Sequence, residues 1–332
     1  MKTAVVGSGA WGTALAIRLC KNGHDVTMWT FEKELIPQME QSRRNPRLPQ
    51  AVLPENLQIS SDYACVRGCK LVVIATPSFP IRGVCRNVAP YLDEDAVLVS
   101  VAKGIENKTH LRMSQVVAQE TGKEVVVLTG PSHAEEVAQD LPTGCLAACE
   151  NKELAEFVQD AFMSEYFRIY TSPDAVGAEL GAALKNVIAL CAGVTDGLGY
   201  GDNTKAMLMT RGLTEIARLG VSMGAQKETF AGLAGVGDLI VTCTSMHSRN
   251  RRAGILIGQG CTAQEAMEKV GAVVEGYYAA SAAWEYAQQH NVEMPIVHAA
   301  YSVLYENASA AEAVKNLLLR QRRAESEDAG WL

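Results

Sequence analysis

Three glycines near the start of the chain constrain its fold more than any other feature. Gly7, Gly9 and Gly12 follow an apolar run at residues 4–6 that is typical of a buried strand, and they precede a helical pattern at 13–19. The first glycine permits a tight turn, the second lets a pyrophosphate approach the backbone, and the third lets the helix pack close to the strand. Strand, glycine turn and helix in this order predict a dinucleotide site, with the phosphates at the helix amino terminus.

Further apolar runs continue the strand pattern through the first half of the chain. Helical patterns separate these runs, which predicts a parallel, doubly wound sheet. The runs lie at 25–30, 71–76, 96–101 and 125–128. Ligands bind at the carboxyl ends of the strands in such a sheet. We therefore expect the site at residues 7–12, 29–31, 76–80, 102–104 and 130–134.

From about residue 172 the pattern becomes almost wholly helical. Ser172 and Pro173 have the pattern of a capping serine followed by a first-turn proline. Helices are predicted at 173–195, 203–222, 249–258, 263–269, 276–290 and 310–322. The sequence thus predicts an α/β protein in which an N-terminal Rossmann-type doubly wound sheet, residues 1–172, is followed by an all-helical C-terminal domain, residues 173–332. The charged tail after the last helix is expected to fray.

Composition narrows the class of protein. The 30 Lys and Arg residues against 37 Asp and Glu residues give a net charge of −7, which argues against a nucleic-acid partner. Nine cysteines without a C-x2-C pair indicate reduced thiols in a cytoplasmic protein rather than a metal site. The amino terminus is already a predicted core strand, which leaves no room for a signal peptide. Because no apolar run approaches the roughly 18 residues of a membrane span, we expect no membrane insertion.

The choice between NAD and NADP depends on the end of the second predicted strand. An acid there would accept the ribose 2′-hydroxyl of NAD, but residues 29–31 contain none and Glu32 lies beyond them. Arg43 or Arg44 could contact a 2′-phosphate, which favours NADP as the cofactor and leaves NAD possible. The alternative is that both arginines are solvated loop charges.

Lys185 is the candidate for proton transfer. It lies in a long stretch of small and apolar residues, and Gly177 and Gly181 precede it on roughly the same helical face. Burial would lower its pKa toward neutrality. The alternative is a structural lysine that extends to the surface. Lys103, after the fourth predicted strand, could neutralise an anion or could be an exposed turn residue.

A phosphate site is predicted at a second helix start. Ser248 is a predicted cap, and Arg249 and Asn250 follow in the first turn. Helix amides, a hydroxyl, a side-chain amide and a guanidinium together can bind phosphate. The alternative is an ordinary cap followed by surface arginines, Arg251 and Arg252 among them.

Two other positions are candidates for supporting roles. Ser132 is predicted to cap a helix, in a capping box with Glu135. Asp238 could orient a lysine ammonium or a substrate hydroxyl. His247 and Cys243 belong to no spaced set of ligands, so no metal is expected.

Taken together, these motifs resemble a known family. Over residues 1–318 the chain closely resembles the bacterial NAD(P)-dependent glycerol-3-phosphate dehydrogenases. The resemblance is carried, in this order, by residues 7–16, 103–106, 130–134, 184–186, 237–239 with 242–243, 248–250 and 274–276.

The resemblance implies a reaction and a set of site residues. It implies hydride transfer between NAD(P)H and dihydroxyacetone phosphate, which gives sn-glycerol 3-phosphate for glycerophospholipid synthesis, in a homodimer with Lys185 as general acid and base. It places cofactor contacts at Gly7, Gly9, Ala10, Trp11, Gly12, Phe31, Lys103, Ala134, Arg249, Val273 and Glu275. It places substrate contacts at Lys103, Gly130, Ser132, Lys185, Asp238, Ser248, Arg249 and Asn250. Ala10 and Phe31 depart from the residues common in the family at the glycine loop and the adenosine end.

Two other classes share parts of this pattern. Dehydrogenases of hydroxyacids or ketopantoate pair the same first domain with a helical second domain, but they do not need the phosphate site at residues 248–250. A non-catalytic NADPH-binding regulator could keep the glycine loop and lose Lys185, yet this chain has both.

Overall fold

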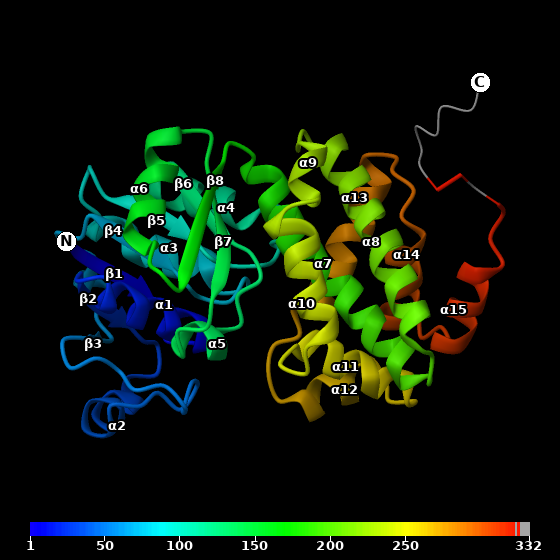
Figure 1. The fold of residues 1–332 in the computed structure, drawn as a ribbon, viewed down its shortest axis with the longest axis horizontal. Coiled ribbons are helices and arrows are strands. Elements are labelled where there is room, and N and C mark those ends of the chain that lie inside the picture. The colour runs from blue at the N-terminus through cyan, green and yellow to red at the C-terminus, as the bar shows by residue number, and fades with distance from the viewer. Residues whose placement is uncertain (323, 326–332) are drawn as a thin grey trace.

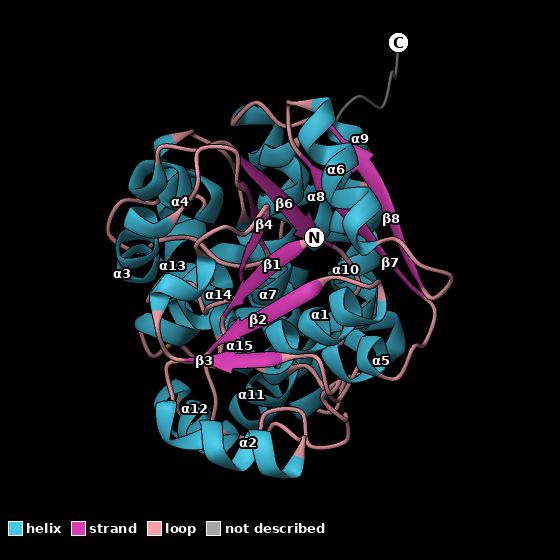
Figure 2. Cartoon of the chain, turned by 90° about the vertical axis from the view of Figure 1, so that its left-hand side faces the viewer, coloured by secondary structure: helices cyan, strands magenta, loops and turns pink. Residues whose placement is uncertain are grey.

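The first half of the chain forms one twisted sheet. The computed structural model describes residues 1–322, 324 and 325. The strands are β1 (Lys2–Val6), β2 (Asp25–Trp29), β3 (Gln58–Ser60), β4 (Leu71–Ile74), β5 (Val97–Ser100), β6 (Val125–Thr129), β7 (Thr143–Ala148) and β8 (Phe167–Ser172). They lie in the order β3-β2-β1-β4-β5-β6-β7-β8, and every neighbouring pair is parallel except β6 and β7 (Figure 2). The predicted doubly wound sheet is therefore confirmed, with one antiparallel pairing that the sequence analysis did not expect.

Alternation along the strands assigns each side chain to one of two cores. Val5 of β1 joins the core on one face, whereas Ala4 and Val6 join the core on the other face. The first face is covered by α1 (Ala10–Lys21), α5 (Ala134–Ala138) and α6 (Lys152–Phe162), and the second by α3 (Ile81–Val88) and α4 (Met113–Thr121). The remaining helix of this half, α2 (Ile36–Ser42), lies in the connection between β2 and β3. Because both faces are covered, the ligand-binding edge is formed by the carboxyl ends of the strands.

The second half of the chain is helical and lies beside the sheet (Figure 1). Its helices are α7 (Ala175–Gly197), α8 (Asp202–Ser222), α9 (Lys227–Phe230), α10 (Asp238–Thr244), α11 (Arg249–Gly258), α12 (Ala263–Val270), α13 (Glu275–Gln289), α14 (Pro295–Tyr305) and α15 (Ala310–Leu318), with a π-helix at Leu233–Gly237. Most predicted helices agree with these bounds within two residues. The last one does not, because α15 ends at Leu318 rather than at residue 322. The predicted serine cap of the first helix is also wrong, since Asp174 caps α7 and Ser172 instead accepts a bond from the Asp174 amide.

Helix α7 is the centre of the helical half. It is long and apolar enough to cross a membrane, contrary to the expectation that no run approaches this length, but 83% of its apolar window is buried inside the protein. A Cβ at Gly193 of α7 would lie 2.1 Å from the Arg251 carbonyl oxygen, and one at Gly254 of α11 would lie 2.0 Å from the Leu190 oxygen. Glycine at both positions lets the two helix backbones touch. Helix α7 is therefore the core against which α11 is fixed.

Candidate active site

The glycine turn after β1 leaves room for an anionic group. A Cβ at Gly12 would lie 2.0 Å from the Gly7 oxygen, and Gly7 itself has φ 131°, so the protein requires glycine at both positions. Gly9 is different, because its φ is −64° and a Cβ there would meet nothing within 4 Å. Helix α1 begins there without a side-chain cap and without an acid in its first turn. The open space and the uncapped helix amides fit a pyrophosphate.

The loop between α2 and β3 supports this turn. The Asn45 side-chain amide is buried and donates to the Ser8 oxygen at 2.8 Å and to the Thr13 hydroxyl at 2.7 Å. The Ser8 hydroxyl donates in turn to the Thr30 hydroxyl, at the end of β2, at 2.7 Å. The turn is thus held from two sides before any ligand binds. Asn45 was not among the predicted site residues.

The two arginines considered for NADP binding contact their own loop. Arg43 donates to the Pro54 and Leu57 carbonyl oxygens, and Arg44 donates to the Pro49 oxygen at 2.7 Å. Arg43 is half-buried, so it is not a solvated loop charge as the alternative interpretation held. Phe31, another predicted cofactor contact, is 84% exposed beyond the end of β2.

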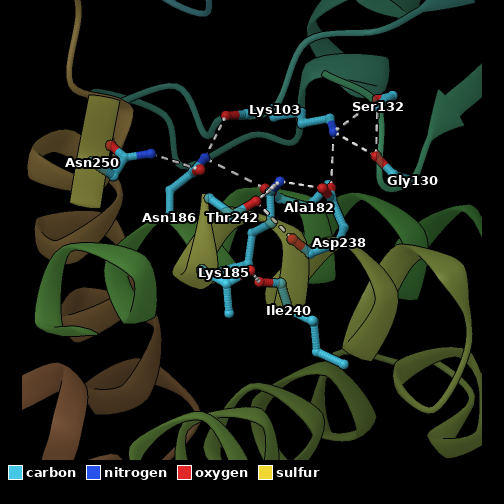
Figure 3. Close-up of polar contacts among 11 residues, drawn as sticks. Lys103, Gly130, Ser132, Ala182, Lys185, Asn186, Asp238, Ile240, Thr242 and Asn250 are labelled. Atoms are coloured by element: carbon cyan, nitrogen blue, oxygen red, sulfur yellow. Dashed lines mark hydrogen bonds and ion pairs between the residues drawn. The ribbon is translucent and has the colours of Figure 1, made fainter. Parts of the chain in front are cut away.

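A buried carboxylate joins two lysines where the sheet meets the helices (Figure 3). Asp238, at the start of α10, is 1% exposed. One of its oxygens accepts from the Lys103 ammonium at 2.8 Å, and the other accepts from the Lys185 ammonium. Lys103 follows β5, whereas Lys185 projects from the middle of α7. The structure therefore brings together three residues that the sequence analysis identified separately.

The surroundings of Lys185 change its acidity. Burial lowers the pKa of Lys185 to about 8, the Asp238 carboxylate opposes this effect, and the Lys103 charge adds to it. The Thr242 hydroxyl accepts from the Lys185 ammonium at 2.7 Å and donates to the Asp238 backbone oxygen at 2.6 Å. This orientation fixes the lysine head. A lysine with such a pKa can give and accept a proton near neutral pH.

The segment after β6 lies on the other side of Lys103. The Lys103 ammonium also donates to the Gly130 oxygen at 2.9 Å and lies 3.5 Å from the Ser132 hydroxyl. The Ser132 hydroxyl donates to Gly130 at 2.9 Å. The predicted capping role of Ser132 is therefore wrong: His133 occupies the N-cap position of α5 and makes no side-chain cap bond. Ser132 instead faces the lysine.

The predicted phosphate residues lie at the start of α11. The Ser248 hydroxyl accepts from the Arg251 amide at 3.2 Å, which confirms the predicted cap. The Asn250 side chain is buried and already bonded, since it donates to Asn186 at 2.9 Å and accepts from the Gly276 amide at 2.8 Å. Arg249 is exposed and makes no hydrogen bond or ion pair within the part of the chain that the structure describes. Its guanidinium lies close enough to the Glu275 carboxylate to lower the pKa of that group, against the larger effect of burial, and its hydrogen-bond donors are available to an anion.

Glu275 links the start of α13 to the end of β4. Its carboxylate accepts from the Ser78 hydroxyl at 2.7 Å, and burial raises its pKa. Val273 is half-buried just ahead of this helix. Among the remaining predicted cofactor contacts, Ala10 and Trp11 lie in the first turn of α1, and Ala134 begins α5. The structure thus places these residues around the carboxyl edge of the sheet.

Three residues of this region were missed as site residues. Asn186 donates to the Lys103 backbone oxygen at 3.3 Å, Thr242 contacts Lys185, and Ser78 contacts Glu275. Asn186 and Thr242 lie within the stretches that carried the family resemblance, and Ser78 lies at a strand end that the sheet pattern had marked. In the described residues, no group of three or more His, Cys, Asp or Glu side chains is placed to hold a metal ion.

Known proteins share this architecture over nearly the whole chain. Models of the N-terminal and C-terminal parts of NAD-dependent glycerol-3-phosphate dehydrogenase match residues 2–155 and 174–315. The chain is similar to glycerol-3-phosphate dehydrogenases named as NAD(P)+-linked from Pelotomaculum thermopropionicum, with 53% identity over 98% of this chain and 95% of that one, and from Fusobacterium nucleatum, with 49% identity over 98% of both. It also superimposes on the crystal structure of glycerol-3-phosphate dehydrogenase from Coxiella burnetii with a TM-score of 0.92 and 37% identity, over 96% of this chain and 99% of that one. The chain therefore belongs to the NAD-dependent glycerol-3-phosphate dehydrogenase family.

Proposed function

We propose that the protein is an NAD(P)-dependent sn-glycerol-3-phosphate dehydrogenase that reduces dihydroxyacetone phosphate for glycerophospholipid synthesis. The observation that carries this proposal is the buried Asp238 carboxylate shared by Lys103 and Lys185, beside a helix start with a free guanidinium. The first feature suits proton transfer to a carbonyl oxygen, and the second suits a phosphate. Family membership supports the same substrate.

Lys185 is the proposed catalytic residue. When bound, the reduced nicotinamide supplies a hydride to C2 of the ketone. The Lys185 ammonium hydrogen-bonds the C2 oxygen and gives it a proton as the carbonyl becomes an alcohol, which leaves a neutral amine. In the oxidation direction the neutral amine accepts the hydroxyl proton. Asp238 and Lys103 set the charge around this amine, and Thr242 orients it.

The substrate phosphate would bind at the start of α11. Arg249 offers a free guanidinium, and the first-turn amides face the anion. Ser248 and Asn250 are each bonded to the protein and still have a donor for the phosphate. The Ser248 hydroxyl accepts from the Arg251 amide and keeps its O–H, and the Asn250 amide uses one N–H for Asn186 and keeps the other.

The glycine turn would hold the cofactor pyrophosphate, with Glu275 and Lys103 near its nicotinamide end. We propose that NADPH is favoured over NADH, because Thr30 rather than an acid follows β2. We further propose a cytoplasmic homodimer. The free thiols of all nine cysteines support the compartment, and family resemblance supports the dimer. Light scattering of the purified protein would test the dimer, which requires twice the mass of the chain.

One assay tests the reaction and the cofactor together. Purified protein is mixed with dihydroxyacetone phosphate and either NADPH or NADH, and absorbance of the reduced nicotinamide is followed. We expect oxidation that requires the phosphorylated ketone and is faster with NADPH. Oxidation with ketopantoate or another 2-keto acid, and none with dihydroxyacetone phosphate, would refute the proposal. Binding of NADPH without any turnover would indicate a regulator.

A further inference from the structure

Three arginines in the first turn of α11 have different surroundings. Arg249 and Arg252 are exposed, and neither makes a hydrogen bond or ion pair with any described residue. The side chain of Arg251 is only 13% exposed and is fully engaged. The interpretation of Arg251 as a surface arginine is therefore wrong, whereas it holds for Arg252.

The Arg251 guanidinium connects three elements. Its Nε and Nη2 both lie 2.8 Å from the Asp196 carboxylate of α7. Its Nη1 donates to the Thr244 carbonyl oxygen, at the end of α10, at 2.7 Å. The second Asp196 oxygen accepts from the Lys205 ammonium of α8 at 2.7 Å. The Asp196 carboxylate thus binds the Arg251 guanidinium with one oxygen and the Lys205 ammonium with the other.

These contacts fix the turn that presents the phosphate surface. Residues 245–248 connect α10, which begins with Asp238, to α11, which begins with Arg249. Met246 in this turn is 57% exposed, and its sulfur lies 3.2 Å from Arg251 Nη1. An exposed turn needs an anchor to hold one conformation. Arg251 supplies that anchor at the carbonyl end of α10.

Arg251 is bonded to α7, the helix that carries the proposed proton donor Lys185. Asp196 and Lys185 both belong to α7, eleven residues or about 16 Å apart at the usual helical rise. Positions of the phosphate surface and of the lysine are therefore defined relative to one rigid element. A phosphate held in this way places the carbonyl of the substrate at a fixed distance from the lysine.

We propose that Arg251 is a positioning residue that pre-organises the turn 245–248 and the start of α11 for the substrate phosphate, with Asp196 holding its guanidinium. This inference rests on the proposed function. Arg251 does not touch the substrate, since its donors face Asp196 and Thr244. Loss of its side chain weakens recognition of the phosphate and leaves the proton transfer at Lys185 intact.

The test compares a phosphorylated substrate with the same ketone lacking phosphate. Arg251→Gln is expected to lower kcat/KM for dihydroxyacetone phosphate by about 30-fold, mainly through KM, because displacement of the helix start costs the phosphate about as much as one of its own charged hydrogen bonds. Its kcat/KM for dihydroxyacetone stays within about twofold of the wild type, because that substrate does not use the phosphate surface. Asp196→Asn follows the same pattern. Arg252→Gln, the matched control, changes neither value.

Two further measurements keep the inference separate from other failures. Calorimetric binding of sn-glycerol 3-phosphate should weaken in Arg251→Gln by a similar factor and stay unchanged in Arg252→Gln, whatever reaction the protein catalyses. If Arg251→Gln does not fold, as judged by its thermal midpoint, Arg251→Lys replaces it and is expected to show a smaller loss in the same direction. Equal loss for both ketones, or unchanged binding of glycerol phosphate, would overturn the inference. If the wild type shows no turnover, but calorimetry shows the expected weaker binding of sn-glycerol 3-phosphate in Arg251→Gln, the proposed function is overturned and this inference is not.

Discussion

The shared carboxylate predicts opposite pH shifts for two variants of the proposed site. Reduction requires the Lys185 ammonium, so kcat/KM for the ketone should fall tenfold per pH unit above the pKa of Lys185, and below that pKa should change only with the ionisation of the substrate phosphate. In the wild type this fall begins at about 8, because burial lowers the pKa of Lys185 to that value. Removal of the charge of Asp238 or of Lys103 must therefore shift the pH at which kcat/KM falls. The direction depends on the sign of the charge removed.

Asp238→Asn should move the fall to lower pH. Without the carboxylate, the buried ammonium loses the charge that opposes its desolvation. At about 4 Å and an effective dielectric constant of about 20, one unit charge changes the free energy of ionisation by about 4 kcal/mol, which limits the shift to about three pH units. A shift of about one to three units is therefore expected. The variant should approach wild-type behaviour most closely at the acid end of the profile.

Lys103→Met should move the fall to higher pH, because it removes a positive charge that disfavours the Lys185 ammonium. The assay is nicotinamide absorbance from about pH 6 to pH 10 at low substrate concentration, so that kcat/KM is measured directly. The substrate phosphate ionises near pH 6 in every variant and serves as an internal reference. Profiles that fall at the same pH in both variants and in the wild type would show that Lys185 is not the titrating group.

Three further predictions address other parts of the structure. Lys185→Met should lower kcat by about 10²- to 10⁴-fold and leave NADPH binding, measured by fluorescence, intact; normal turnover would exclude Lys185 as the acid. Gly9→Ala should unfold at the wild-type temperature, because its Cβ meets only open space, but should bind NADPH weakly, because that space is the proposed pyrophosphate site. Gly12→Ala should lose thermal stability, because its Cβ contacts the Gly7 oxygen. Tight NADPH binding by Gly9→Ala would show that the pyrophosphate does not bind at this turn. Burial raises the pKa of Glu215 from 4.5 to about 7, although the Ile296 and Val297 amides donate to its carboxylate. The folded state therefore binds this proton more tightly than the unfolded chain does. The free energy of unfolding consequently falls as the pH rises from 4.5 to about 7. Urea unfolding at several pH values should show that Glu215→Gln removes up to about 3 kcal/mol of this pH-dependent decline in the free energy of unfolding. The same pH dependence in Glu215→Gln and in the wild type would contradict the burial argument.

Periodic patterns in the sequence predicted the elements that have two-sided burial. Strands β1, β4, β5 and β6 are continuous apolar runs, because helices cover both faces of the sheet there. Strand β8 was missed although Phe167 and Ile169 are buried and alternate with exposed Arg168 and Tyr170, which is the pattern of an edge strand. Short β3 and small-residue β7 offer no comparable signal. Edge position, brevity and, for the internal strand β7, small side chains therefore explain which strands the pattern missed.

Local motifs failed where a distant residue competes for the same group. Ser132 and Glu135 have the spacing of a capping box, yet Ser132 faces Lys103, which lies 29 positions earlier. At Asn250 the local pattern is incomplete rather than wrong, because it predicts a phosphate contact and does not show that the same amide also joins Asn186 to Gly276. A local pattern gives the bonds that a side chain can make within its own turn. It does not give the partners that tertiary packing brings to it.

The proposed site depends on pairings that neither half of the chain contains alone. Lys103 follows strand β5, and Asp238 and Lys185 come from the helices, so the Asp238 carboxylate that opposes the lowering of the Lys185 pKa is also bonded across the two halves, to Lys103. Glu179 of α7 supports the same junction, because its buried carboxylate accepts from Arg112 at 2.5 Å and from the backbone amide at the start of α4 at 2.7 Å. Each half has a self-consistent hydrophobic pattern, which is why its fold could be predicted. Their relative placement depends on a few buried charges whose partners lie 67 and 135 positions apart, and the Lys103 charge that this placement brings to the site adds to the lowering of the Lys185 pKa by burial.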